Sequence, residues 1–581
     1  MPQPTDRMPH RPLHPRPLPP RMDERRAGRA VALAVAGALA LAGCTASGTG
    51  TTATEAAGPA ASLQSGEGVL AVPAAQDAGY GRVSGSPAAA AVAASRTFFA
   101  SAQVAVLASD TGDVAPAAER ARALGVPLLL VPGQPAPAAG ASESGTAEDG
   151  ATTDEAKADA AKAEAAKKDA AKAQAAVAAE LSRLGVRSVE AYAVPDTSFL
   201  PGIDVVDPGS TSVPDAAAQD NADQANAAQA STSDAGRAAV VHLKDPGALG
   251  AAGLAAVTAT AQAAGAEVSE LATADPRAEQ NRQFFAEREG RLVVAAGDGF
   301  GSTADFGSTA ATAAAGSELP GGGQLLFPQR RMVALYGHPG TPSLGLLGEQ
   351  GIEESIARVK KLAAEYQPYS KEPVQPAFEI ITTVATGHSG TDGKYSAYTA
   401  VDKLKPWIDA AQKAGVYVVL DLQPGRNDFL VQAKKYEELL KRPNVGLALD
   451  PEWRLKPNQR HLVQIGSVDA AEINKVSAWL AELVREHALP QKMLILHQFQ
   501  LRMIRDRDTL ETGHPELSLV LHADGNGTPG QKQDTWNALR RDLPPGIRMA
   551  WKNFIDEDEP TFSPKRTYSE VDPKPWFVSY Q

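Results

Sequence analysis

Eight short apolar segments recur at regular intervals from Arg330 to the end of the 581-residue sequence. Amphipathic stretches with helical periodicity lie between several of them, for example at 354–366, 429–442 and 471–487. Eight strands alternating with helices over about 250 residues match the size and order of a (β/α)₈ barrel. The sequence therefore predicts an α/β fold with a TIM-type barrel over residues 330–581. The expected strands are Met332–His338, Ala377–Val384, Val416–Gln423, Val445–Trp453, Lys492–Phe499, Leu517–Gly525, Ile547–Phe554 and Trp576–Gln581.

A barrel of this kind places its functional side chains at the carboxyl ends of its strands and in the loops that follow. Because side chains alternate along a strand, Asp421 and Asp450 are expected to point inward, and Glu379 to point inward at a deeper level. Gln498 and Lys552 each alternate with a better inward candidate. The side chains predicted to surround the mouth are Tyr336, His338, Asp421, Asp450, Glu452, His497, Gln498, His522, Asp524, Trp551, Lys552 and Asn553.

Two carboxylates end the fourth strand segment, where Asn444–Leu455 reads NVGLALDPEWRL. Carboxyl groups in one site push each other's pKa apart, so one can stay protonated as an acid while the other stays ionised. Glycoside hydrolysis uses such a pair, and an aromatic ring often supports the sugar. This pattern predicts a glycan-directed hydrolase, with candidate sugar platforms at Tyr336, Trp453 and Trp551.

The segment GLALDPEW resembles the strand-four signature of chitinase-like glycoside hydrolases, Gly-x-Asp-x-Asp-x-Glu, and the Asp-x-Glu strand end of wall-lysing muramidases. Ala448 stands where the chitinase-like pattern has its first Asp. The resemblance implies that Glu452 is the general acid and that Asp450 orients the substrate's N-acetyl group. Asp421 is predicted to be a further supporting carboxylate. The side chains predicted to bind the substrate are Tyr336, His338, Trp453, His497, His522, Asp524 and Trp551.

Two other interpretations stay open. His338, His497 and His522 could join Asp421 or Asp524 around a divalent metal, as in metal-dependent hydrolases of barrel fold. The barrel could instead be a non-catalytic glycan-binding protein, which the missing Asp at Ala448 also fits. The preferred interpretation assigns no cofactor and no metal.

The N-terminus has the organisation of a bacterial lipoprotein. Arg25, Arg26 and Arg29 precede an apolar run that is too short to span a bilayer but typical of a signal peptide. The run ends in Leu-Ala-Gly-Cys, which matches the bacterial lipobox, and Cys44 is the single cysteine of the chain. We expect a signal peptide at 1–43, a lipid on Cys44, and a flexible tether at 44–67. The mature protein is then anchored on the outer face of the cell membrane.

Residues 68–323 are expected to form a smaller parallel α/β domain. Residues 102–109 and 126–133 read as strands, and the helix at 115–125 between them is closed by a glycine. Low-complexity inserts interrupt the pattern at about 134–178 and 205–236. Within the first insert, the Ala-, Lys- and Glu-rich stretch 154–178 predicts a single solvated helix of roughly 25 residues.

The predicted strand-helix-strand segments at 95–131 and 178–194 resemble the second type of cell-wall-binding repeat in Gram-positive surface proteins, and 291–306 resembles the start of another copy. The resemblance implies binding to cell-wall polysaccharide, so the expected partners are a wall glycan and, through the lipid anchor, a membrane. The net charge of −12 and a pI near 5.5 argue against a nucleic-acid partner.

Overall fold

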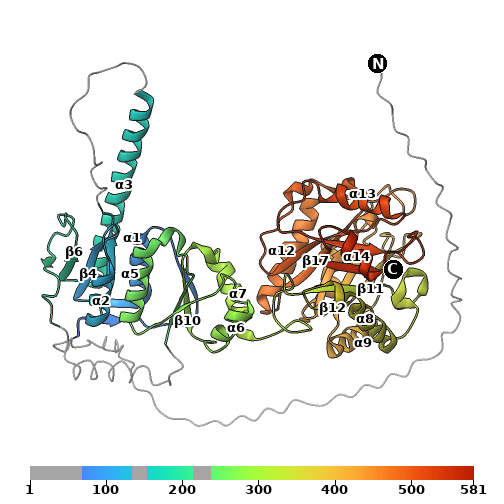
Figure 1. The fold of residues 1–581 in the computed structure, drawn as a ribbon, viewed down its shortest axis with the longest axis horizontal. Helices are drawn as coiled ribbons and strands as arrows, with labels where there is room; N and C mark the ends of the chain where they lie inside the picture. Colours follow the sequence, from blue (N-terminus) through green and yellow to red (C-terminus); the bar gives the residue numbers. More distant parts are fainter. Residues whose placement is uncertain (1–68, 134–152, 213–236) are drawn as a thin grey trace, which may run out of the picture. The chain divides into compact units, whose positions relative to one another are not determined.

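The structure is a computed structural model that describes residues 69–133, 153–212 and 237–581 (Figure 1). The predicted signal peptide, Cys44 and the tether lie outside these residues, as do the insert segments 134–152 and 213–236. No helix in the described part of the chain is long and apolar enough to cross a membrane.

The C-terminal part is a closed barrel of eight parallel strands, as the sequence predicts. The strands follow one another around the barrel in chain order, and β11 pairs with both β12 and β21, which closes the ring. The strands are β11 (Arg331–Gly337), β12 (Val374–Ala385), β14 (Tyr417–Leu422), β15 (Val445–Leu449), β17 (Lys492–Gln498), β19 (Leu517–Ala523), β20 (Arg548–Asn553) and β21 (Phe577–Tyr580). A short strand, β13 (Ser396–Tyr398), adds antiparallel to the end of β12.

Alternation along the strands separates two apolar cores. Tyr417, Val419 and Ala448 belong to the core inside the barrel, whereas Leu447 and Leu449 pack in the core between the strands and the helices. Asp421 and Asp450 continue the inward rows of Val419 and Ala448, which is the register that the sequence predicts.

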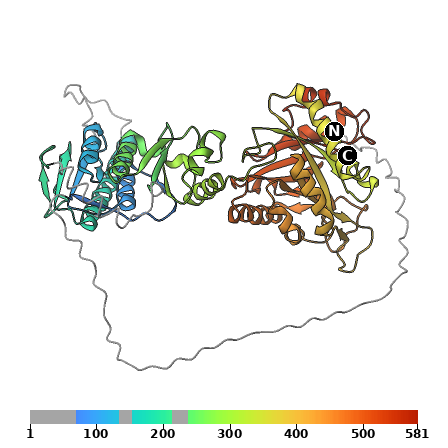
Figure 2. The same ribbon diagram turned by 90° about the horizontal axis from the view of Figure 1, so that it is seen from below.

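Helices cover the outside of the barrel strands (Figures 1 and 2). Local sequence signals set their ends. For example, α9 stops where Gly415 takes a left-handed φ of 73°, and α13 starts at a capping box between Thr528 and Gln531. The main helices are α8 (Ile352–Tyr366), α9 (Val401–Ala414), α10 (Phe429–Ala433), α11 (Glu437–Leu440), α12 (Ala470–Glu486), α13 (Pro529–Arg540) and α14 (Pro564–Glu570).

Apolar side chains fill the amino-terminal end of the barrel. Leu319, Leu326 and Phe327 pack in one cluster with Met332 and Met493 from the first turns of two strands. A ligand therefore has to approach the barrel interior from the opposite end, where the strands finish.

Two parallel sheets of four strands each precede the barrel, which confirms the predicted α/β class of this part. One sheet has the order β5-β4-β6-β7 and the other has the order β2-β10-β8-β9. The strand β2 lies far upstream of its sheet partners in sequence. The strands are β2 (Gly79–Val83), β4 (Val104–Ser109), β5 (Leu128–Val131), β6 (Ser188–Tyr192), β7 (Asp204–Val206), β8 (Ala239–His242), β9 (Glu267–Glu270) and β10 (Leu292–Ala296).

The Ala- and Lys-rich stretch is helical, but it is not a separate insert. It forms the start of one continuous helix, α3 (Thr153–Leu184), which projects from its sheet in Figure 1. Val177 and Leu181 in its last turns are buried in the apolar core, whereas Lys167 and Lys168 are exposed. Ala, Lys and Glu all favour helix, so nothing interrupts the helix where its apolar face begins.

The fourth barrel strand is shorter than predicted. β15 ends at Leu449, and Pro451–Trp453 form a turn of 3₁₀ helix instead of continuing the strand. The Asp450 carboxylate caps this turn by accepting the Glu452 backbone N–H at 3.2 Å, and Pro451 has no N–H to give to a neighbouring strand.

Candidate functional site

Acidic and basic side chains converge inside the carboxyl end of the barrel. They come from inward-facing positions on seven strands and from the turn after β15. All of them are buried except Glu452 and Asp524, which are partly exposed. The group, called here the mouth cluster, comprises Tyr336, Glu379, Asp421, Asp450, Glu452, His497, His522, Asp524, Lys552 and Ser579.

The turn after β15 presents Glu452 to this region. Its backbone is fixed on both sides, because Asp450 accepts the Glu452 N–H and the Gly466 N–H donates to the Glu452 carbonyl at 2.7 Å. Arg454, the nearest basic residue in sequence, pairs with Glu472 at 2.9 Å. Among the described residues, no side chain or backbone group hydrogen-bonds to the Glu452 carboxyl group or pairs with it. This carboxyl group is free to contact a ligand.

Asp421 and Lys552 are both held against the ring of Tyr336. The Tyr336 hydroxyl donates to Asp421 Oδ2 at 2.8 Å, and the Lys552 ammonium lies 3.7 Å from the centre of the ring. Lys552 also pairs with Asp524 Oδ1 at 3.1 Å. The other Asp421 oxygen, Oδ1, is buried and accepts no hydrogen bond from the described residues. Tyr336 therefore positions a carboxylate, and its buried ring offers no open face to a sugar.

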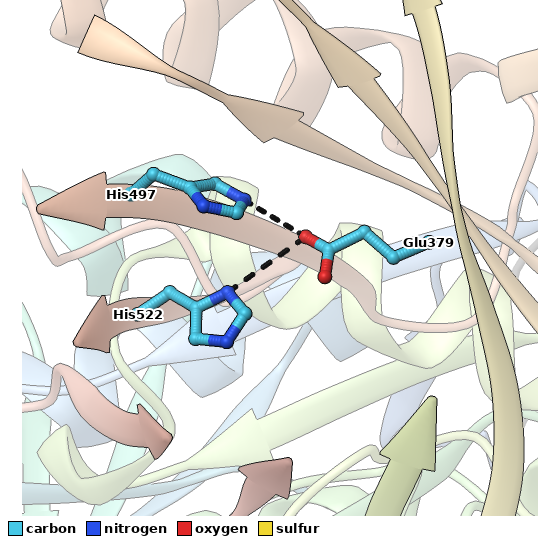
Figure 3. A group of neighbouring side chains, drawn as sticks. All are labelled: Glu379, His497 and His522. Carbon is cyan, nitrogen blue, oxygen red and sulfur yellow. Dashed lines mark hydrogen bonds and ion pairs between the residues drawn. The ribbon is translucent and has the colours of Figure 1, made fainter. Parts of the chain in front are cut away.

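His497 connects two carboxylates. Its Nδ1 lies 2.8 Å from Asp524 Oδ2, and its Nε2 lies 2.9 Å from Glu379 Oε1. His522, on the neighbouring strand, turns Nδ1 toward the same Glu379 oxygen at 3.8 Å (Figure 3). Its Nε2 lies 3.1 Å from the Ser579 hydroxyl. Two imidazoles thus face one carboxylate oxygen.

Burial raises the pKa of three of the carboxyl groups, so they stay protonated at pH values at which exposed carboxyl groups are ionised. It raises the pKa of Glu452 to about 7, with the Asp524 charge adding to the effect. It also raises the pKa of Asp421 to about 6, and it raises the pKa of Asp450 well above the usual value. The Asp524 pKa is lowered instead, because Lys552 and His497 outweigh the effect of burial. One barrel end thus contains both protonated acids and an ionised carboxylate.

The structure places three of the predicted ligand-binding side chains away from this group. His338 is bound in its own loop region, with Nε2 3.0 Å from the Thr399 hydroxyl. Trp551 was predicted to face the mouth, but it packs in the outer core against Trp536 and Phe562, because Lys552 takes the inward position on β20. Trp453 lies in the turn after β15, outside the buried group, with its ring 5.4 Å from His461.

Sequence reasoning missed several members of the site. Glu379 was expected deeper in the barrel, but it reaches His497, and Ser579 was not singled out. Lys552 was predicted to lie at the mouth only as an alternative to Trp551, and it is the cation of the mouth cluster. A charged residue within each of two apolar strand segments was the signal available for Glu379 and Lys552.

An aromatic and basic group at the loops beside Glu452 was also missed. The rings of Tyr395 and His461 are 6.3 Å apart, and the Arg426 guanidinium lies 4.2 Å from the centre of the Tyr395 ring. Together with Trp453, these residues form what is called here the aromatic rim. They come from three different loops, so no local sequence pattern links them.

No protein-family model matches this chain, and no curated protein matches it.

The geometry around Gly466 provides a test of the Glu452 turn. A Cβ atom on this residue would lie within 2.7 Å of the carbonyl oxygens of Pro451, Glu452 and Arg454. We expect Gly466→Ala to displace the turn and to reduce any activity that depends on Glu452 by about 100-fold, as small misplacements of catalytic groups do. The barrel should stay folded by circular dichroism. Gly530→Ala is the matched control, because its Cβ meets no atom within 4 Å. Equal activity of both variants would contradict this account of the turn.

Proposed function

We propose that the barrel is a glycan-directed hydrolase in which Glu452 is the general acid and Asp450 and Asp421 are supporting carboxylates. The observation that carries this proposal is the Glu452 carboxyl group itself. It stands at the carboxyl end of a barrel strand without a partner among the described residues, while the neighbouring acids are held by Tyr336 and by the turn backbone.

The proposed reaction uses the two kinds of carboxyl group in the site. Since the pKa of Glu452 is raised to about 7, Glu452 carries a proton at neutral and mildly acidic pH and can donate it to the glycosidic oxygen as the bond to the anomeric carbon breaks. The positive charge that develops on the sugar ring requires an ionised carboxylate nearby; Asp524, whose pKa is lowered, is one, and Asp421 becomes another above about pH 6. By its resemblance to the chitinase-like signature, Asp450 is assigned to orient an N-acetyl group. A water molecule then adds its hydroxyl to the anomeric carbon and gives its remaining proton to Glu452, which restores the acid.

The aromatic rim supports a sugar as the ligand. Trp453 directly follows the acid in sequence, and the ring of His461 lies 5.4 Å from its own. Sugar rings stack on such side chains through their C–H faces, while groups such as the Arg426 guanidinium can donate hydrogen bonds to hydroxyl or carboxylate groups. A polymer lying across the rim would bring one glycosidic bond to Glu452.

The proposed cellular location of the reaction rests on the N-terminal sequence. A lipid on Cys44 would hold the barrel at the outer face of the membrane, and the α/β part resembles wall-binding repeats, so peptidoglycan is the first substrate to test. Cys44→Ser is expected to move the protein from the membrane fraction to the supernatant of fractionated cells. An unchanged membrane fraction would contradict the anchor.

The direct test is release of reducing ends from purified peptidoglycan and from chitin oligomers by the full-length chain, with and without a chelator. Activity that survives chelation supports acid–base glycoside hydrolysis, whereas activity lost with the chelator would move the assignment to a metal-dependent reaction.

One observation favours the alternative of a non-catalytic glycan-binding protein. Asp421, Asp450 and Lys552 are at most 2% exposed, so side chains fill the space beneath Glu452. If the chain binds wall glycan but releases no reducing ends from it, the non-catalytic alternative is supported.

The pH dependence of stability tests the buried acids independently of any substrate. The folded chain holds protons on Glu452 and Asp421 up to about pH 7 and 6, whereas the unfolded chain releases them near 4.5 and 3.8. A raised pKa in the folded state contributes stability at low pH, and that stability is lost as the pH rises through the folded value. We expect the Glu452 contribution, about 3 kcal/mol, to be lost between pH 4.5 and 7.

The measurement is urea unfolding of the full-length chain and of Glu452→Gln across this pH range. The variant should lose less stability than the parent chain as the pH rises. If the free energy of unfolding changed equally with pH in both proteins, Glu452 would not titrate as the structure indicates.

A further inference from the structure

Glu379, His497 and His522 form a second centre within the mouth cluster. Glu379 Oε1 lies 2.9 Å from His497 Nε2 and 3.8 Å from His522 Nδ1, and the three atoms lie within 4.8 Å of one another (Figure 3). All three side chains are 0% exposed. Three ligands at about 2.0–2.1 Å from a tetrahedral ion are separated by about 3.3 Å, a value that lies between the two distances measured here.

Two buried side-chain atoms of this centre have no hydrogen-bond partner among the described residues. Glu379 Oε2 and His522 Nδ1 are fully buried, and neither makes a hydrogen bond with the described residues. Since buried polar atoms are rarely left without a partner, His522 Nδ1, which faces Glu379 Oε1 at 3.8 Å, is available to a further ligand.

The outer nitrogen of each imidazole is held by an acceptor. His497 Nδ1 lies 2.8 Å from Asp524 Oδ2, and His522 Nε2 lies 3.1 Å from the Ser579 hydroxyl. If each outer nitrogen carries its proton toward that acceptor, the inner nitrogens, His497 Nε2 and His522 Nδ1, present their lone pairs to Glu379. Metal-binding histidines are held in this way, with the second nitrogen donating to a carboxylate or another oxygen.

We propose that Glu379, His497 and His522 bind a divalent transition-metal ion of the zinc type, with Asp524 and Ser579 as positioning residues. Two imidazole nitrogens and one carboxylate oxygen are ligands that such ions accept, and three protein ligands leave a coordination position open. The ion would occupy the place of the proton that His497 shares with Glu379. This site is distinct from the predicted metal set, because His338 is bound to Thr399 and Glu379 takes its place.

A second group with suitable atoms, Asp450, His497 and Asp524, is a weaker candidate. It would need the Nδ1 atom of His497, which already contacts Asp524, and Asp524 is paired with Lys552 at 3.1 Å. The ammonium group of Lys552 would repel an ion at that position, so the Glu379 centre is favoured.

The test measures metal binding rather than hydrolysis, so its result does not depend on the proposed function. The full-length chain is stripped with a chelator, dialysed, and titrated with Zn²⁺ for stoichiometry and affinity. Co²⁺ is used in parallel, because its visible absorption reports nitrogen and oxygen ligands in a site of low coordination number. We expect one ion per chain. Glu379→Gln and His522→Gln should each weaken binding at least about 100-fold, whereas His338→Gln should leave it unchanged.

Ser579→Ala keeps the proposal testable if either buried-ligand variant fails to fold. This small change removes only the acceptor for His522 Nε2, and it should weaken Zn²⁺ binding by about 10-fold, the lower end of the effect of losing such a partner. Absence of stoichiometric binding to the parent chain would overturn the proposal. So would unchanged affinity in Ser579→Ala, or in Glu379→Gln and His522→Gln when both are folded.

Discussion

Glu452→Gln is expected to reduce glycan hydrolysis by about 10²–10⁴-fold, the usual contribution of a general acid. Gln has nearly the same size as Glu and cannot donate an acidic proton to a leaving group. Because no group among the described residues hydrogen-bonds to the Glu452 carboxyl, the substitution breaks no internal contact and should leave the fold intact. Reducing-end release from peptidoglycan and chitin oligomers measures the effect.

The matched control is Glu482→Gln, which changes an exposed carboxylate on α12 and should leave turnover as it is. If Glu452→Gln retained the activity of the parent chain, Glu452 could not be the acid, and the proposed reaction would have to be abandoned.

Lys532→Met is expected to lower the free energy of unfolding by about 3–5 kcal/mol, the cost of leaving a buried charge without its partner. The Lys532 ammonium contacts Asp558 Oδ2 and donates to the Lys552 carbonyl at 2.7 Å. Both charged side chains are at most 4% exposed. Asp558 also accepts the backbone N–H groups of Phe554 and Gly527, at 2.9 and 3.0 Å. The pair therefore holds the loop after β20, beside the strand that carries Lys552.

Chemical unfolding with urea measures this effect, and Arg566→Met is the control. Arg566 forms an exposed ion pair with Glu570 four residues along α14, and such pairs contribute about 0.5 kcal/mol or less. The double variant Lys532→Met with Asp558→Asn should recover part of the loss, since the unpaired charge is then gone. Equal losses in Lys532→Met and Arg566→Met would show that the buried pair does not contribute as described.

The barrel could be predicted because the local sequence is enough to identify each of its strands. Each apolar segment has strand length and turn residues at its ends, and β-strand alternation fixes which side chains share a face. Asp421 and His497 therefore lie where the sequence places them, inside the carboxyl end. The exposed part of α3 was predicted for the same kind of reason, since its composition alone favours helix.

The composition of the site could not be predicted fully, because it depends on which of two adjacent residues faces inward and on how far a side chain reaches. On β20 both Trp551 and Lys552 are compatible with either face; the tertiary fold selects Lys552, because Asp524 lies 3.1 Å from its ammonium. Glu379 lies within β12 rather than at its end, yet its long side chain reaches His497 on β17. The Glu379–His497 contact joins residues 118 positions apart, and no local pattern reports it.

The upstream position of β2 has a consequence for how the α/β part can fold. β2 (Gly79–Val83) pairs with β10 (Leu292–Ala296), so every strand of the other parallel sheet lies between these two partners in sequence. Bringing the ends of so long a segment together costs conformational entropy, and contacts of large sequence separation slow folding. If the enclosed sheet forms first, it shortens the effective loop. We therefore expect β2 to pair late, and a nascent chain to keep the β10 edge open until that step.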